Sequence, residues 1–387
     1  MKKPWQFVLK VAGRCNINCD YCYMYNLGDN SILSKQKFMS RETFAKSIDA
    51  IAEYSRSHHI TRVGIALHGG EPLLMGLHRF ADFCELTREG LGEDAVIAIQ
   101  TNGTLLNEEW VKLFARYGIL VGVSIDGPAV QHDRHRKDHK GQGTYNAAVR
   151  GYQTAKRASS AGIIKEVSII SVIDPTEDPE EYYSWLKNDL AASYVSVLPP
   201  DANHDNIDEH YHFSIDQMSN YLISLFEIWW NSTDNISIRL YENIVTMLLG
   251  GHSNAELVGS TGATTVVIDI DGDIQIHDVA RTCEESQDPR INVHTSSIDS
   301  IFSQPGYLEL NPSAEEMADD CQNCAVFRYC QGGFVTHRYS NVGRYRNPSV
   351  YCSAWFNLIT HVYFRLLGSD PAIVGRSRAK VEEVAVH

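Results

Sequence analysis

Short apolar segments alternate with longer amphipathic segments over residues 1–225. The apolar segments have the length and composition of parallel strands that are covered on both faces. The amphipathic segments have helical periodicity, as in 41–57, which follows a potential N-cap at Ser40, and in 107–117. This alternation predicts an α/β fold that is built from βα units. The predicted strands are Phe7–Val11, Val63–His68, Val96–Gln100, Leu120–Ile125, Val167–Val172 and Tyr194–Leu198.

The pattern changes in the second half of the chain. The apolar periodicity of segment 215–249 predicts helices. We assign residues 226–258 to a helical bridge between two modules. Thr265–Ile270 and Ile274–His277 flank an Asp-Gly turn, which predicts a β-hairpin. We therefore predict three consecutive modules: an α/β module at 1–225, the bridge at 226–258 and a C-terminal module at 259–387.

Composition and charge narrow the functional classes. The net charge of −14 argues against nucleic acid as a main partner, because phosphate binding needs a basic surface. The N-terminus contains no signal-peptide pattern and the chain contains no apolar run long enough for a membrane span, so we expect no membrane partner. Most of the nine cysteines fall into two groups, which indicates metal ligation in a reducing compartment and predicts a cytoplasmic enzyme.

The first cysteine group directly follows the first predicted strand. The run CNINCDYC contains Cys15, Cys19 and Cys22, with Tyr21 before the last cysteine. A [4Fe–4S] cluster is normally held by four thiolates, so three would leave one iron open for an exchangeable ligand. Zinc is the alternative, but structural zinc sites use four ligands and usually a CxxC pair.

This cysteine triple resembles the signature of radical S-adenosylmethionine (SAM) enzymes. The resemblance implies a partial (β/α)6 TIM barrel, in which the amino and carboxylate groups of SAM bind the open iron. It also implies that an electron from the cluster cleaves SAM and releases a 5′-deoxyadenosyl radical. In such barrels the chemistry lies at the C-terminal ends of the strands, where this chain places its unusual polar motifs.

Several of these motifs resemble the SAM-binding elements of the family. GGEP follows the second predicted strand, and the resemblance implies that its backbone and its glutamate hold the SAM amino group; an ordinary Gly-Gly turn is the alternative. The run HDRHR at residues 132–136 resembles a stretch in which an arginine, here Arg136, pairs with the SAM carboxylate. A solvated charged loop is the simpler interpretation of this run. His132, His135 and His139 could instead form a metal site. The predicted cofactor-binding residues are Tyr21, Gly69, Gly70, Glu71, Pro72, Gln100, Asn102, Ser124, Asp126 and Arg136.

The second cysteine group comprises Cys321, Cys324, Cys330 and Cys352. Its spacing resembles the C-terminal half of a SPASM domain, the auxiliary-cluster module of radical SAM enzymes that act on peptides. Four thiolates complete a [4Fe–4S] site with no open position, although a four-cysteine zinc site is the alternative. The resemblance therefore implies two [4Fe–4S] clusters in total, one that binds SAM and one auxiliary.

The C-terminal module departs from the full SPASM pattern, which has seven cysteines and two auxiliary clusters. Phe334 and His277 stand where the full pattern has cysteines, and the stretch 259–263 contains none. We interpret Cys84 and Cys283 as residues that do not bind a cluster, with Cys84 buried on a helix. One auxiliary cluster is therefore expected to be missing.

This reduced module resembles that of FxsB-type and cyclophane-forming maturases. The resemblance implies a ribosomally made precursor peptide as substrate and an external electron donor of the flavodoxin or ferredoxin type. In the implied reaction a β-hydrogen is removed from a side chain, and the carbon radical adds to an aromatic ring to form a C–C crosslink. Asp278 resembles in position the proton acceptor of sulfatase-maturing relatives and is the predicted catalytic base, unless it only caps the hairpin or pairs with Arg281.

Other functions remain open at this point. The chain could be a sulfatase-maturing oxidase, a peptide epimerase in which Cys283 or Cys84 donates hydrogen, or a thioether-forming enzyme. A non-enzymatic iron–sulfur or zinc scaffold is a remote alternative. Resemblance of fold does not choose among these chemistries, because one fold hosts many reactions.

Overall fold

The computed structural model describes residues 4–27, 30–253, 255–259, 265–283 and 291–368. The chain divides into two compact units whose segments are interleaved in the sequence. The first unit contains Met1–Val172, Ala192–Tyr194 and Ala263–Leu310, and the second contains Ile173–Ala191, Val195–Gly262 and Asn311–His387. The predicted modules, in contrast, are consecutive, with boundaries at residues 225 and 258.

The first unit is built on a mostly parallel sheet. Its central strands are β1 (Gln6–Ala12), β3 (Gly64–Gly69), β4 (Val96–Thr101), β5 (Leu120–Ser124) and β7 (Ser168–Val172), hydrogen-bonded in that order. Adjacent strands in this series are parallel throughout. Neither end of any of these strands differs from its predicted position by more than one residue, so the α/β fold predicted from the alternating pattern is confirmed.

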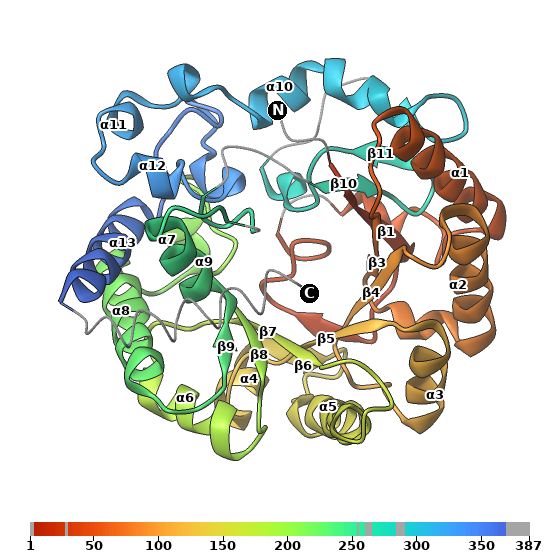
Figure 1. The fold of residues 1–387 in the computed structure, drawn as a ribbon, viewed down its shortest axis with the longest axis horizontal. Coiled ribbons are helices and arrows are strands. Elements are labelled where there is room, and N and C mark those ends of the chain that lie inside the picture. Colours follow the sequence, from red (N-terminus) through yellow and green to blue (C-terminus); the bar gives the residue numbers. More distant parts are fainter. Residues whose placement is uncertain (1–3, 28–29, 254, 260–264, 284–290, 369–387) are drawn as a thin grey trace. The chain divides into compact units, whose positions relative to one another are not determined.

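Helices connect these strands and cover the outer face of the sheet (Figure 1). They are α1 (Arg41–Ser57), α2 (Leu77–Leu91), α3 (Glu108–Tyr117) and α5 (Tyr145–Ser160). Their ends are set by local chemistry: Ser40 accepts a hydrogen bond from the backbone of Thr43, and Asn107 caps α3 in the same way. Gly118 ends α3 in the left-handed conformation, with φ of 63°.

The predicted hairpin forms, but it belongs to the first unit. It comprises β10 (Thr265–Ile268) and β11 (Asp273–Gln275), which pair antiparallel, and β12 (Ile291–Asn292) pairs with β11. β10 lies beside β1 as a parallel strand, with Gln6 opposite Thr265 and Leu9 opposite Ile268. The hairpin therefore extends the central sheet of the first unit at its β1 edge.

Shorter elements complete the first unit. β2 (Ile17–Cys19) pairs with β6 (Arg136–Asp138), and α4 (Ala129–His135) leads into β6. Single 3-10 turns occur at Ser31–Leu33, Pro72–Met75, Val279–Thr282 and Ile298–Ser303, followed by α10 (Pro305–Leu310).

The second unit is mainly helical. α8 (Ile215–Asn231) and α13 (Cys352–Leu367) pack along each other, and α9 (Arg239–Leu248) contacts α13. α8 and α9 confirm the helices predicted for segment 215–249. The remaining elements are α6 (Pro179–Asn188), β8 (Tyr194–Leu198), α7 (Ile207–His210), β9 (Ser237–Ile238), α11 (Asp319–Gln322), α12 (Phe327–Cys330) and the 3-10 turns Ala314–Glu316 and Val335–Arg338. Over the described ranges, the structure contains no helix that could serve as a membrane span.

Candidate active site

The first cysteine group lies in a tight loop after β1. Cys19 is in β2, directly opposite Arg136 of β6. The backbone N–H of Cys22 donates to the carbonyl of Cys19 over 3.1 Å. Burial raises the pKa of Cys15 to about 12 and that of Cys19 to about 11. Three thiols within one loop, one of them buried and two half-buried, fit a metal cluster, because a bound metal stabilises the thiolate that burial disfavours.

Tyr21, Asp126 and Arg136, all predicted to bind the cofactor, lie together beside this loop. The Tyr21 hydroxyl donates to the Asp126 carboxylate, and Arg136 Nη1 donates to the same hydroxyl over 2.6 Å. Arg136 also forms an ion pair with Asp126 at 3.6 Å. Arg136 is only 8% exposed, and its Nε has no hydrogen-bond partner among the described residues. A buried donor of this kind fits an acceptor group of a bound cofactor.

The two glycines of GGEP are required by the cysteine loop. Gly69 has φ of 132°, and a Cβ at this position would lie 2.2 Å from the carbonyl oxygen of Ala12. A Cβ at Gly70 would lie 2.4 Å from the carbonyl oxygen of Arg14 and 2.2 Å from the Tyr25 hydroxyl. The backbone N–H of Gly70 donates to Ala12 over 2.7 Å. The glycines thus hold the start of the cysteine loop against the end of β3.

Glu71 is fully buried, and its carboxylate connects the GGEP segment to the end of β4 by hydrogen bonds. Its Oε1 accepts from Thr101 Oγ1 over 2.7 Å and from the backbone of Leu73 over 3.0 Å. Its Oε2 accepts from the backbone of Asn102 over 2.8 Å. Burial raises the pKa of Glu71, while these hydrogen bonds act in the opposite direction. Pro72 begins the following 3-10 turn. Contact of Glu71 with the SAM amino group stays a prediction.

The polar residues predicted at the ends of β4 and β5 are adjacent. Gln100 Nε2 donates to Ser124 Oγ over 2.7 Å. Asn102 Nδ2 lies 3.6 Å from the sulfur of Cys15 and donates to Asn16 Oδ1 over 2.9 Å. Asn102 therefore contacts the cysteine loop directly, whereas Gln100 and Ser124 contact each other.

His132, His135 and His139 do not share a site. Nε2 of His132 lies 3.1 Å from Thr144 Oγ1, and Nδ1 of His135 lies 2.9 Å from an Asp20 oxygen. Nε2 of His139 lies 3.0 Å from the carbonyl oxygen of Cys15. Each ring thus has a different partner, which contradicts the metal site that was the alternative for these residues. Among the described residues, no three His, Cys, Asp or Glu side chains have the geometry of a site for one metal ion.

Asp278 is part of a buried polar cluster that the sequence did not indicate. Its Oδ2 forms an ion pair with Lys10 and accepts from the Tyr23 hydroxyl over 2.6 Å. Lys10 Nζ also lies 2.7 Å from the Tyr23 hydroxyl and 3.1 Å from His68 Nδ1. Oδ1 of Asp278 is buried and accepts no hydrogen bond from the described residues, so it has a free lone pair.

Sheet register brings this cluster together. Lys10 on β1 is directly opposite His68 on β3, near the C-terminal ends of both strands. The pairing of β10 with β1 brings the hairpin, and with it Asp278, to the same edge. A lysine within the apolar strand Gln6–Ala12 was the available sequence signal, because a buried lysine needs a partner. Among the described residues, Arg281 forms an ion pair with Asp269, at 3.6 Å.

Burial and the ion pair determine the charges in this cluster. Burial raises the pKa of Asp278, but the Lys10 ammonium and neighbouring positive groups outweigh it, so the net pKa lies below the usual range. Burial lowers the pKa of Lys10, and Asp278 opposes that change. Burial, with the nearby Lys10 charge, lowers the pKa of His68 to about 3. At neutral pH the cluster therefore contains a carboxylate and a neutral imidazole.

The second cysteine group lies in the second unit. Cys321, Cys324, Cys330 and Cys352 line one small recess, together with the side chain of Phe356 on α13. Burial raises the pKa of Cys321 to about 11 and that of Cys330 to about 12. Four thiols around one recess fit a fully ligated cluster, as the spacing predicts.

The remaining cysteines lie elsewhere. Cys84 is fully buried on α2, as expected, and burial raises its pKa to about 12. Cys283 follows the 3-10 turn Val279–Thr282, where its sulfur lies 3.9 Å from Thr282 Oγ1. Phe334, which stands at a cysteine position of the full pattern, packs edge-on against His337 at 5.1 Å. Of the cysteine-free stretch 259–263, only Gly259 is among the described residues.

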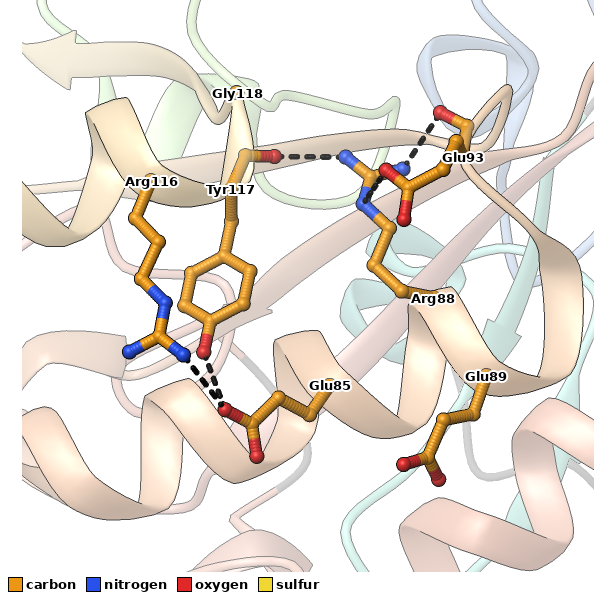
Figure 2. Close-up of a pocket in the computed structure, with 7 residues that line it drawn as sticks. All are labelled: Glu85, Arg88, Glu89, Glu93, Arg116, Tyr117 and Gly118. Atoms are coloured by element: carbon orange, nitrogen blue, oxygen red, sulfur yellow. Dashed lines mark hydrogen bonds and ion pairs between the residues drawn. The ribbon is translucent and has the colours of Figure 1, made fainter.

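Another recess lies on the outside of the first unit, between α2 and α3 (Figure 2). Several of its side chains are bonded within the recess: Glu85 Oε1 accepts from the Tyr117 hydroxyl over 2.7 Å, and Arg88 Nη2 donates to the Tyr117 carbonyl over 2.7 Å. These residues precede β4 and β5, so the recess is at the N-terminal edge of the sheet. The cysteine loop and Asp278 are at the opposite edge, which is therefore the candidate active site of the first unit.

The chain is similar to known proteins over most of its length. Residues 9–187 match the model of the radical SAM superfamily. A cysteine-type anaerobic sulfatase-maturating enzyme of Clostridium perfringens is 24% identical over 379 residues, which cover 94% of this chain and 98% of that protein. A serine-type enzyme of Bacteroides thetaiotaomicron is also 24% identical, over 93% of this chain and 90% of that protein.

Two solved structures extend the comparison. The structure of native anSMEcpe with bound AdoMet has a TM-score of 0.81 at 24% identity, and covers 94% of this chain and 98% of that chain. Streptococcus suis SuiB bound to S-adenosylmethionine has a TM-score of 0.58 at 16% identity, over 86% of this chain and 73% of that chain. Similarity at this level of identity establishes the fold.

Residues 9–187 match the radical SAM superfamily, and the chain has the α/β fold of radical SAM enzymes. It is an enzyme whose cofactors are S-adenosylmethionine and [4Fe–4S] clusters. The cysteine loop and the buried donor of Arg136 fit these groups. The sulfatase-maturating relatives correspond to one of the alternatives left open by the sequence.

Proposed function

We propose that this radical SAM enzyme oxidises a side chain of a peptide by two electrons, with Asp278 as the proton acceptor. The observation that carries this proposal is the position of the Asp278 carboxylate. It is held by Lys10 and Tyr23 at the C-terminal edge of the sheet, and Oδ1 remains available to accept a proton. The names of the sulfatase-maturating relatives and of the SuiB complex with precursor peptide SuiA support a peptide substrate.

The cofactor assignments follow from the cysteines and their surroundings. Cys15, Cys19 and Cys22 hold the SAM-binding cluster, and Arg136 binds the SAM carboxylate through its free Nε donor. With SAM bound, this cluster supplies a carbon-centred radical that removes a hydrogen atom from the substrate. Gln100, Asn102, Ser124 and Asp126 line the same edge of the sheet and position the cofactor.

The protein must then accept one proton and one electron from the substrate. Asp278 is ionised at neutral pH because its pKa is below the usual range, so it is in the accepting form. Its pairing with Lys10 makes it a weak base, which suits a strongly acidic radical intermediate of the substrate. Cys321, Cys324, Cys330 and Cys352 would hold an auxiliary cluster, which would supply an acceptor for the electron. An external donor of the flavodoxin or ferredoxin type supplies the electron that starts each turnover.

The product depends on the fate of the substrate radical. Oxidation of a serine or cysteine side chain gives an aldehyde or thioaldehyde, as in a sulfatase-maturing reaction. Addition to an aromatic ring before the proton and the electron are lost gives a C–C crosslink, and the substrate again loses two hydrogens. Two substitutions favour the crosslinking alternative: Phe334 and the buried His277 stand at cysteine positions of the full auxiliary module.

The deciding experiment presents both kinds of substrate to the anaerobically reconstituted enzyme. One substrate is a sulfatase-derived peptide with a serine or cysteine at the modified position; the other is a short peptide encoded beside the gene. Mass spectrometry is combined with hydrazine labelling, which detects an aldehyde but not a crosslink. We expect a substrate that has lost two hydrogens, together with one equivalent of 5′-deoxyadenosine.

The outcomes separate the alternatives. A labelled product identifies side-chain oxidation, whereas an unlabelled product that resists fragmentation between two residues identifies a crosslink. An unchanged mass with a deuterium from solvent would identify epimerisation and would contradict the proposed oxidation.

A further inference from the structure

His68 is the last side chain of β3, and it has no role in the proposed transfers of the proton and the electron. Its Nδ1 lies 3.1 Å from Lys10 Nζ and accepts a hydrogen bond from the backbone N–H of Gly69 over 2.8 Å. A backbone N–H can only donate, so Nδ1 is the ring nitrogen without a proton. The ring is therefore a neutral imidazole that carries its proton on Nε2.

The surroundings of His68 favour the same protonation state. Burial and the nearby charge of Lys10 lower the pKa of His68 to about 3, so the ring stays neutral at neutral pH. A ring in this state does not take up the proton that Asp278 accepts. The chemistry left to His68 is the donation of one hydrogen bond through Nε2.

The Nε2 atom of His68 is available for such a bond. It has no hydrogen-bond partner among the described residues, which also leave it accessible, because the side chain is only half-buried. His68 is opposite Lys10 in the sheet, and Lys10 Nζ contacts both His68 Nδ1 and the Asp278 carboxylate. The C-terminal edge of the sheet thus holds one donor and one acceptor without partners, His68 Nε2 and Asp278 Oδ1.

We propose that His68 positions the peptide substrate by donating a hydrogen bond from Nε2 to a backbone carbonyl oxygen beside the modified residue. This inference rests on the proposed function, because it places the peptide at the edge where Asp278 accepts the proton. An uncharged donor suits an uncharged acceptor, and every peptide sequence offers carbonyl oxygens. Lys10 and Gly69 hold the ring through Nδ1, so the direction of the donor is fixed before the peptide binds.

Two substitutions separate the roles of the two ring nitrogens. His68→Asn has a short side chain, which places an amide oxygen near the position of Nδ1 and leaves no donor near that of Nε2. His68→Gln has a longer side chain, which places an amide NH2 group near the position of Nε2. Donation to the peptide is therefore lost in the first variant and kept in the second. Support of Lys10 and Gly69 is kept in the first and weakened in the second.

The measurement is the formation of 5′-deoxyadenosine as a function of peptide concentration, with the peptide that is modified in the deciding experiment above. This readout reports hydrogen abstraction, whatever product the substrate radical then gives. In His68→Asn we expect a KM for the peptide about 3- to 10-fold above the native value, with little change in kcat, because one neutral hydrogen bond is lost. In His68→Gln we expect a KM close to the native value.

His58→Asn and His58→Gln are the matched controls. His58 is the C-cap residue of α1 and pairs with Asp299, and it precedes the start of β3 at the N-terminal edge of the sheet. Both control variants should keep the native KM for the peptide.

A native KM in His68→Asn would overturn the inference. A KM that rises equally in both His68 variants would also overturn it and would leave His68 as a residue that only supports Lys10. The mass of the peptide is recorded in the same reactions. A peptide of unchanged mass, together with the expected pattern of KM values, would contradict only the proposed oxidation; an oxidised peptide with native KM values throughout would contradict only this inference.

Discussion

Lys10 and Asp278 are 268 positions apart in the chain and form a buried ion pair at the C-terminal edge of the sheet. The pair exists because the hairpin that carries Asp278 adds β10 to β1, the strand that carries Lys10. Tyr23, from the cysteine loop, donates to the same carboxylate oxygen. One oxygen of Asp278 is thereby fixed, while the other is left without a partner among the described residues.

Asp278→Asn tests the proton-accepting role. The amide keeps the shape of the side chain but removes its basic lone pair. A positioned base typically contributes about 10²–10⁴-fold to a rate, so modified peptide should fall by that factor. 5′-Deoxyadenosine should still form, because hydrogen abstraction precedes proton loss. Both products are quantified by liquid chromatography and mass spectrometry in the same reaction.

The control for this prediction is Asp271→Asn, in the turn of the same hairpin. Asp271 pairs with Lys35 and is 35% exposed, so this variant should retain coupling between the two products. An unchanged yield of modified peptide in Asp278→Asn would mean that water or another group accepts the proton.

Lys10→Met tests how the ion pair tunes Asp278. Loss of the ammonium should raise the pKa of Asp278, because burial would then act without its main opposing charge. In the native enzyme, the ratio of modified peptide to 5′-deoxyadenosine should stay constant from neutral to mildly acidic pH. In Lys10→Met the ratio should fall at a higher pH, as the carboxyl becomes protonated. The measurement is this ratio as a function of pH.

The same pair has a predictable effect on stability. The folded pKa of Asp278 is below its unfolded value, so the stabilisation is present above the unfolded pKa and is lost as pH falls through the folded pKa. Removal of Lys10 alone leaves a buried carboxylate and should cost about 3–5 kcal/mol at neutral pH. The double variant with Asp278→Asn should recover part of that loss in denaturant unfolding. Lys35→Met, which removes one of the cations paired with Asp269, is the control and should not move the pH profile of the product ratio.

The central sheet was predictable because each strand is a short apolar segment with clear limits. β4 begins at Val96, as predicted, and α1 occupies the predicted range Arg41–Ser57 after its serine cap. The hairpin was also predictable from its Asp-Gly turn. Its pairing with β1 was not, because sequence patterns specify strands but not which distant edge they join.

The site was predictable only in part for the same reason. Local motifs indicated the cysteines and the cluster of Tyr21, Asp126 and Arg136, which the structure brings together. The contact of Lys10 with Asp278 depends on the long-range pairing of β10, so a local motif could not reveal it.

Replacing the first cysteine group tests the division between the two clusters. The reconstituted enzyme should contain about eight irons, from two [4Fe–4S] clusters. The combined variant Cys15→Ala, Cys19→Ala and Cys22→Ala should retain about half of that iron and should not cleave SAM. Cys84→Ala is the control. Cys84 is buried on α2 and is distant in the sequence from both cysteine groups, so this variant should leave the iron content unchanged. Iron near twelve in the native enzyme would instead indicate a third cluster.

Replacing the second group should separate SAM cleavage from peptide oxidation. Cys321→Ala or Cys330→Ala should leave SAM cleavage intact and abolish modified peptide, since the electron from the substrate loses its acceptor. The cluster also holds this small module together, so we expect a lower unfolding temperature for these variants. Elemental analysis of anaerobic protein is the companion measurement, and zinc in place of iron would contradict the electron-accepting role.

Arg136 should determine the affinity for SAM. Its Nε is a buried donor without a partner among the described residues, and its Nη1 is already bonded to Tyr21. A hydrogen bond to a charged group contributes about 1.5–3 kcal/mol, so Arg136→Gln should weaken SAM binding about 10- to 100-fold. Arg136→Lys should also weaken it, because an ammonium cannot replace the fork of the guanidinium. Isothermal titration calorimetry on the anaerobic enzyme measures the Kd, and Lys137→Gln, at the exposed neighbouring position of β6, is the control. Native affinity in both Arg136 variants would assign this arginine to the packing of Tyr21 and Asp126 alone.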